Sequence, residues 1–91
     1  MDERQGQFLI AIYTVQNEIG RARVLDIARH LGLDIRNSKA DRYLYQETTL
    51  KLREVGYIDS FAMDEWVTCG IVRLTGKGLN YVESKRRSAL A

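Results

Sequence analysis

The sequence predicts an α+β fold in which three helices precede a β-hairpin and a closing helix. Before residue 56, apolar residues recur at spacings of three and four in three separate segments, which is typical of amphipathic helices. After it, two segments rich in β-branched and aromatic residues flank a short polar break, as in a hairpin. With 91 residues the chain is enough for one small core. We expect one domain over residues 1–91, with its core at about 5–85 and a frayed tail at 88–91.

The first predicted helix runs from about Gln5 to Ile19 and carries more apolar surface than one buried face needs. Its core face is predicted to be Phe8, Ile12, Val15 and Ile19, at helical spacing, and further apolar residues lie on its other sides. A helix that is apolar nearly all round should be buried nearly all round. We therefore expect a homodimer, with a monomer that exposes an apolar face as the alternative. The residues predicted for the dimer interface are Phe8, Leu9, Ile12 and Tyr13.

A second, shorter helix is predicted after a break at Gly20. Residues 21–23 form a short connection that could add an edge strand to a small sheet. In the helix that follows, Val24, Ile27, Ala28 and Leu31 are predicted to be buried, and Gly32 supplies the stop. His30, at the helix end, is read as a surface residue. Three arginines of this region are possible phosphate contacts: Arg21, Arg23 and Arg29.

The third predicted helix, from about Ser38 to Val55, is the one around which the chain is organised. Ser38 followed three residues later by Asp41 resembles a capping box. The predicted buried face, at helical spacing, is Tyr45, Thr48, Leu52 and Val55, and Gly56 ends the helix. The outward residues near its start are two cations, an aromatic and an amide, which suit a DNA groove. They are Lys39, Arg42, Tyr43 and Gln46.

The last third of the chain is predicted to form a hairpin and a helix. The strands are expected at 57–63 and 67–74, joined by the polar break Asp64, Glu65 and Trp66. Thr75 is expected to cap the final helix, which ends in the basic run 85–87. Strand alternation and helical spacing predict which side chains face the core. These are Ile58, Gly70, Val72 and Leu74 in the strands, and Leu79 and Val82 in the helix.

The order and spacing of a long apolar helix and three later segments carry a family resemblance. The segments read VLDIARHLG at 24–32, LREVGYI at 52–58 and VRLTGKGLNYV at 72–82, and the last contains LTGKG at 74–78. Over about residues 5–85 the chain resembles the winged helix-turn-helix DNA-binding domains of bacterial and archaeal transcription regulators. The resemblance implies a recognition helix ending in LREVGYI and a wing ending in LTGKG. Two departures are a longer span between Gly32 and Gly56 and an acidic hairpin tip, which opposes DNA contact by the wing.

Several function classes are not supported by the sequence. Its single Cys69 and single His30 offer neither a disulfide nor a set of ligands with zinc spacing, so we expect no metal and no cofactor. No nucleophile has a partner base and no glycine loop fits a phosphate, so we expect no enzyme. No apolar run is long enough for a membrane span and no signal segment opens the chain, so we expect a cytoplasmic protein.

The leading hypothesis is sequence-dependent binding of double-stranded DNA by a small dimeric transcription regulator. The helix from about Ser38 to Val55 would enter the major groove, where Arg42 could read guanine and Gln46 could read adenine. Neighbouring side chains at the start of the helix would hold phosphates. The predicted DNA-binding residues are Arg36, Asn37, Ser38, Lys39, Arg42, Tyr43 and Gln46. The sequence indicates no small-molecule effector.

The alternative hypothesis is a winged helix used for protein–protein interaction, or a viral or plasmid-borne adaptor without direct DNA binding. Three features favour it: the modest net charge of +2, the acidic tip at Asp64 and Glu65 beside Trp66, and the excess apolar surface of the first helix. Any one of the outward polar side chains of the third helix could equally be the solvated side of an amphipathic helix.

Overall fold

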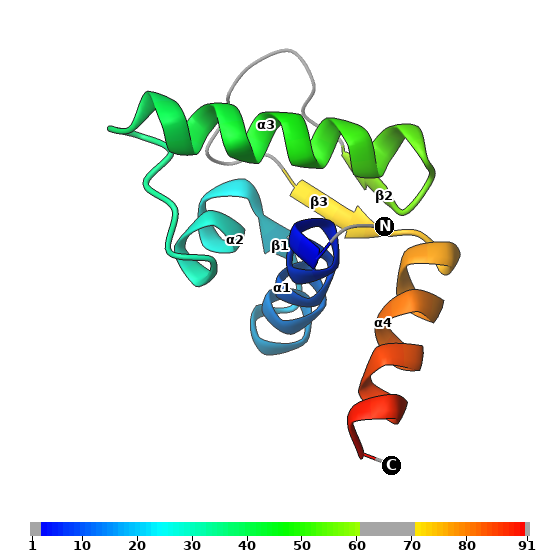
Figure 1. Cartoon of the computed structure of the whole chain (residues 1–91). Coiled ribbons are helices and arrows are strands. Elements are labelled where there is room, and N and C mark those ends of the chain that lie inside the picture. The colour runs from blue at the N-terminus through cyan, green and yellow to red at the C-terminus, as the bar shows by residue number, and fades with distance from the viewer. Residues whose placement is uncertain (1–2, 61–70, 91) are drawn as a thin grey trace.

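The computed structural model describes residues 3–60 and 71–90, and within them the elements follow the predicted order (Figure 1). The predicted α+β class is confirmed, including the short strand between the first two helices. The elements are α1 (Glu3–Ile19), β1 (Ala22–Arg23), α2 (Val24–His30), α3 (Lys39–Glu54), β2 (Ile58–Ser60), β3 (Ile71–Leu74) and α4 (Gly76–Leu90).

The three strands form one antiparallel sheet in the order β1-β3-β2. Ile58 pairs with Leu74 across β2 and β3, and Ala22 pairs with Val72 across β1 and β3. The edge strand predicted at 21–23 is therefore present as β1. Ile58 and Val72 are buried and Leu74 is half-buried, as strand alternation predicted. The predicted hairpin tip, together with Cys69 and Gly70, lies outside the described residues.

Helix α1 lies at the centre of the molecule and contacts α2, α3, α4, β1 and β3 (Figure 1). Phe8, Leu9 and Ile12 are each at most 2% exposed within this single chain. Their prediction as dimer-interface residues is wrong, because the chain's own elements already surround them and leave no surface for a second copy. Of the four residues predicted there, only Tyr13 keeps part of its surface accessible. Ile19, predicted to be buried, is 58% exposed at the last residue of the helix.

Helix α3 packs on α1 through Tyr45, Thr48 and Leu52, all buried as predicted. The ring of Tyr45 lies 5.6 Å from that of Phe8, centroid to centroid, and burial raises the pKa of Tyr45. Val55 is 44% exposed, so its predicted burial is wrong. The helix ends at Glu54, and the chain turns away through Gly56 in the left-handed conformation that glycine favours.

Helix α4 begins at a cap that also ties it to the end of α3. Thr75 Oγ1 accepts from Gly78 N at 3.2 Å, which confirms the predicted cap, and donates to Gly56 O at 2.6 Å. Val82 is fully buried, but Leu79 is 38% exposed, so the prediction that it faces inward is wrong. The helix meets the rest of the chain on the side of Gly78 and Val82, and Leu79 lies at the margin of that contact.

Replacing Gly78 with alanine tests the close approach of α4 to the turn after α3. A Cβ atom at position 78 would overlap the backbone carbonyl of Tyr57, whereas one at Gly76 would meet nothing within 4 Å. We expect Gly78→Ala to lower the free energy of unfolding by about 1–3 kcal/mol, the usual cost of overpacking. Gly76→Ala, the matched control, should leave it unchanged or raise it by up to about 1 kcal/mol. Urea unfolding followed by circular dichroism measures both, and equal stabilities for the two variants would contradict the packing described.

Candidate nucleic-acid interface

Helix α3 crosses one end of the molecule and turns one side outward (Figure 1). The side opposite to Tyr45, Thr48 and Leu52 consists of exposed residues at helical spacing. Tyr43 is 64% exposed and Leu50 is 45% exposed, which are large fractions for side chains of this size. We call this side the outer stripe of α3. It consists of Lys39, Tyr43, Gln46, Glu47, Leu50 and Glu54.

The start of α3 is capped by Ser38, as the sequence predicted. Ser38 Oγ accepts from Asp41 N at 3.2 Å, and Ser38 N donates to Asp34 O at 3.0 Å. The second half of the predicted box is different: Asp41 Oδ2 does not reach back to the cap but accepts from Asp34 N at 2.9 Å. Ser38 and Asp41 therefore both fix the loop that precedes the helix.

The loop at residues 33–38 accounts for the extra length between α2 and α3 that the sequence showed. One carboxylate organises it: Asp34 Oδ1 accepts from Asn37 N at 3.1 Å, and Asp34 Oδ2 accepts from Asn37 Nδ2 at 3.3 Å. The side chain of Ile35 is only 4% exposed and anchors the loop in the core. The amide of Asn37, predicted to hold phosphate, is thus already engaged within the loop.

Arg42 does not point outward as the sequence predicted. It is half-buried, and its guanidinium donates through Nε to Ile35 O at 2.9 Å and through Nη2 to Arg36 O at 3.0 Å. This geometry contradicts the predicted outward placement of the side chain, because its Nε and one Nη2 donor are turned to backbone carbonyls of the loop. Arg42 instead ties the first turn of α3 to the loop.

Four of the predicted residues remain outward and close together along the chain. Arg36 leaves the loop next to the carbonyl that Arg42 holds, and Lys39 occupies the first position of α3. Tyr43 and Gln46 continue from Lys39 along the outer stripe, four and seven residues on. We call this set the loop–α3 surface. Its members are Arg36, Lys39, Tyr43 and Gln46, and all four are exposed.

The three arginines predicted as possible phosphate contacts do not form one cluster. Arg23 directly precedes α2 and Arg29 lies in its last turn, so about 9 Å of helix axis separates them. Arg21 belongs to the turn before β1. Of the three, Arg23 pairs with Ile71 across β1 and β3, at the end of the sheet from which residues 61–70 depart. It is therefore the arginine placed beside the base of the hairpin.

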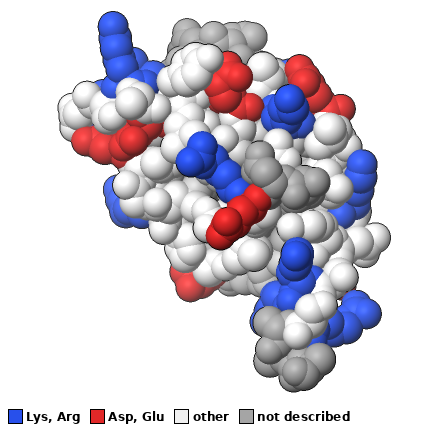
Figure 2. Space-filling model, in the orientation of Figure 1, with Lys and Arg blue, Asp and Glu red and all other residues white. Residues whose placement is uncertain are grey.

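The charge over α2, the loop and α3 is mixed. Residues 24–55 contain six basic and five acidic side chains. Figure 2 shows Lys, Arg, Asp and Glu interspersed over this end of the molecule, with no continuous basic face in that view. Within the outer stripe, the cation Lys39 lies at the start, while Glu47, Leu50 and Glu54 occupy the second half. A polyanion is therefore better tolerated at the first half of α3 than at the second.

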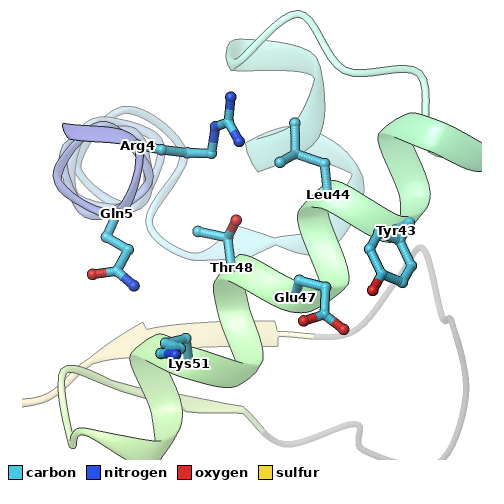
Figure 3. A pocket seen from close by; sticks show the side chains of 7 residues that line it. All are labelled: Arg4, Gln5, Tyr43, Leu44, Glu47, Thr48 and Lys51. Atoms are coloured by element: carbon cyan, nitrogen blue, oxygen red, sulfur yellow. The ribbon is translucent and has the colours of Figure 1, made fainter. Parts of the chain in front are cut away.

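A shallow groove runs between the start of α1 and one flank of α3 (Figure 3). Its volume is about 410 Å³, and its lining includes one carboxylate, Glu47, and the two cations Arg4 and Lys51. Sequence reasoning missed this groove because its two walls are some forty residues apart in the chain and meet only through helix packing. The lining residues are Arg4, Gln5, Tyr43, Leu44, Glu47, Thr48 and Lys51.

Over residues 3–60 and 71–90, no three side chains of the His, Cys, Asp and Glu types gather to hold a metal ion. No described helix is both long and apolar enough to cross a membrane.

Replacing Arg42 tests whether it is a structural tie. Arg42→Ala removes two charge-assisted hydrogen bonds to backbone carbonyls, so we expect the free energy of unfolding to fall by about 1–3 kcal/mol. Lys39→Ala removes an exposed cation of the same turn and should change it by no more than about 0.5 kcal/mol. Thermal or urea unfolding measures both. An Arg42→Ala variant as stable as Lys39→Ala would mean that the guanidinium is free in solution.

The chain is similar to a known protein in structure but not in sequence family. No family model matches the sequence, and no curated protein matches it either. Among solved structures, the chain is similar to MarR of Staphylococcus aureus in complex with salicylate and kanamycin, with a TM-score of 0.58 and 19% sequence identity. The match covers 93% of this chain and 55% of that one, so the chain spans about half the length of that protein. The described residues, with their helices and three-stranded antiparallel sheet, have the winged-helix fold that the sequence predicted.

Proposed function

We propose that this protein binds double-stranded DNA and acts as a small transcription regulator, with the first half of α3 in the major groove. The observation that carries the proposal is the exposed loop–α3 surface, which brings two cations, an aromatic ring and an amide to the start of one helix. The likeness to MarR, a transcription regulator of the same fold, supports it. In winged and other helix-turn-helix proteins, the second helix of the pair enters the groove with its N-terminal residues at the base edges.

Each outward side chain has a role that its chemistry permits. The amide of Gln46 can pair with the N6 and N7 positions of adenine, and it lies about two turns into the helix. Lys39 at the first turn and Arg36 in the loop can hold phosphates on either side of that base. Tyr43, between Lys39 and Gln46 on the same stripe, can contact a base edge or a thymine methyl group.

The ordered loop favours such binding because it fixes the cations before DNA arrives. The backbone of Arg36 is held by Arg42, and the loop is closed by Asp34 and Asp41. A surface fixed in its bound form loses less conformational entropy on association. Arg42 acts here as a positioning residue, not as a reader of guanine.

Substitutions at Gln46 and Lys39 test the proposal. Gln46→Ala should weaken binding to a preferred duplex by about 1–3 kcal/mol and relax the preference at one base pair. Lys39→Ala should weaken binding to every duplex alike. It should also reduce the slope of log affinity against log salt concentration by about 1, the contribution of one phosphate contact. Fluorescence anisotropy with a selected duplex and scrambled duplexes measures both effects. Asn17→Ala, an exposed substitution on α1, is the control, and binding by Gln46→Ala and Lys39→Ala equal to this control would overturn the assignment.

A second candidate is a protein-interaction module, and one observation favours it. The second half of the outer stripe and the turn after it expose Leu50 at 45% and Val55 at 44%, beside Glu47 and Glu54. That mixture fits an apolar protein contact better than a phosphate backbone. The same anisotropy series decides between the two, because DNA binding through several phosphates falls steeply with rising salt while an apolar contact changes little.

We further propose a homodimer in which α1 contributes a smaller surface than the sequence suggested. Ile10 is 41% exposed and lies between Gly6 and Tyr13 on one side of α1, given their spacing of four and three. We expect sedimentation equilibrium to give twice the chain mass of 10.5 kDa, and Ile10→Glu to shift it toward the monomer. Asn17→Glu adds the same charge at an exposed polar position of the same helix and should leave the mass unchanged. A wild-type monomer at millimolar concentration would contradict dimerisation.

A further inference from the structure

The positive charge of this protein is concentrated in its last twenty-one residues. Residues 71–91 contain five basic side chains and one acidic one, whereas residues 1–70 contain nine basic and eleven acidic ones. The net charge of +2 thus combines a C-terminal segment of +4 with a remainder of −2. The segment that contributes the excess is not the one that carries the proposed base-reading helix.

Three of these five cations gather at the C-terminal end of α4, away from α3. Lys77, at the start of α4, donates through Nζ to Val55 O at 2.9 Å, so this end of the helix lies beside the end of α3. Arg86 is nine residues further on, about 13 Å along the axis, and α4 runs away from α3 in that direction (Figure 1). Figure 2 shows Lys and Arg atoms gathered at that end of a molecule 40 Å long.

Three consecutive cations, Lys85, Arg86 and Arg87, are all exposed there and spread over most of one helical turn. Two of them contact aromatic side chains, one on α1 and one on α4 itself. Arg86 Nη1 donates to Tyr13 Oη at 2.7 Å, with its guanidinium carbon 5.1 Å from the ring centroid, and Lys85 Nζ lies 5.8 Å from the ring centroid of Tyr81. One hydrogen bond uses one of the five N–H donors of a guanidinium, so donors of Arg86 remain for another acceptor.

Two simpler explanations account for less of this arrangement. Cations in the last turn of a helix complement its dipole, but that effect falls off within one turn, and of the three cations only Arg87 lies in the last turn of α4. An amphipathic helix on a lipid surface needs an apolar face, whereas the exposed described residues that flank the three cations along α4 are Ser84 and Ser88. A purely polar, basic surface fits a polyanion whose charges repeat at its surface, as the phosphates of a nucleic acid do.

We propose that the C-terminal end of α4 binds the phosphate backbone of a second DNA duplex, so that one protein links two DNA segments. The choice of duplex DNA as the polyanion rests on the proposed function of α3. The α4 surface contributes no base reading, because its cations project from an exposed helix end with no element placed to enter a groove. Binding there is therefore independent of sequence and strongly dependent on salt.

A bridging experiment with the full chain tests the proposal. A biotinylated duplex on beads is incubated with protein and a fluorescent duplex of unrelated sequence, and the retained fluorescence is measured. Lys85→Gln with Arg87→Gln removes two cations and leaves the contact between Arg86 and Tyr13 in place. Arg4→Gln with Lys51→Gln removes two exposed cations elsewhere and gives the same net charge. Circular dichroism confirms that both variants are folded.

Beads with the α4 variant are expected to retain about tenfold less of the second duplex than beads with the wild type. The slope of log retention against log salt concentration should fall by about 2, the contribution of two phosphate contacts. The affinity of the α4 variant for a single preferred duplex should stay within about twofold of the wild-type value. The charge-matched variant, Arg4→Gln with Lys51→Gln, should stay within about twofold of the wild type in both bridging and single-duplex affinity. Equal bridging by the two variants would overturn the proposal. So would an equal loss of single-duplex affinity in the α4 variant, because one duplex would then contact both surfaces. Capture by phosphatidylserine vesicles in place of the second duplex would also overturn it.

The Lys39→Ala, Gln46→Ala double variant separates this inference from the proposed function. With both proposals correct, it loses sequence preference but still binds duplexes weakly through α4. If it behaves as the wild type in every assay while the α4 variant loses bridging, the assignment of α3 is wrong and that of α4 stands.

Discussion

The burial of α1 is the constraint on which the rest of the fold depends. A helix with apolar side chains on nearly all sides must be covered nearly all round, and the chain provides that cover with three helices and two strands of its own. Leu9 and Ile12 lose all of their accessible surface in this arrangement. At roughly 1.5–3 kcal/mol for each large aliphatic side chain, this burial is a main source of stability in so small a domain. Because α3 must place Tyr45 and Leu52 against α1, its opposite side is necessarily turned outward.

The loop at residues 33–38 gives the start of α3 a fixed neighbour and so helps to define the loop–α3 surface. A loop of this length would ordinarily be mobile, but here two carboxylates and one guanidinium bind its backbone, and Ile35 anchors it in the core. Arg36 and Arg42, six residues apart in the sequence, consequently have different roles in the structure. Arg42 satisfies carbonyl groups that would otherwise depend on water, whereas Arg36 is left at the surface. A basic residue near a helix N-terminus is therefore not by itself a DNA contact, and its partners have to be known.

The excess positive charge lies apart from the helix proposed to read bases, so the two ends of the molecule would contribute differently to DNA binding under these proposals. The start of α3 offers few cations and several groups that can distinguish bases, while the described end of α4 offers exposed cations but no neighbouring element to guide them into a groove. Electrostatic attraction to phosphates supplies most of the non-specific affinity of DNA-binding proteins, and contacts to base edges supply specificity. A protein with a nearly neutral recognition element would draw its affinity from elsewhere, and α4 is where the excess charge is found.

The sequence by itself determined the order of the elements, the caps at Ser38 and Thr75, and the inner faces of α2 and α3, because periodicity and capping depend on residues within a few positions of one another. Tertiary structure decided what lay beyond that range. Leu9 was expected at a dimer interface and lies in the core, and Phe8, expected at both, lies in the core alone, since periodicity identifies an apolar side but not the neighbour that covers it. Ile19, Val55 and Leu79 were expected inside and are exposed, since each lies where a helix ends or leaves the packed body. The clearest case is Arg42, whose acceptors are carbonyl groups six and seven residues away, brought within reach only by the folded loop.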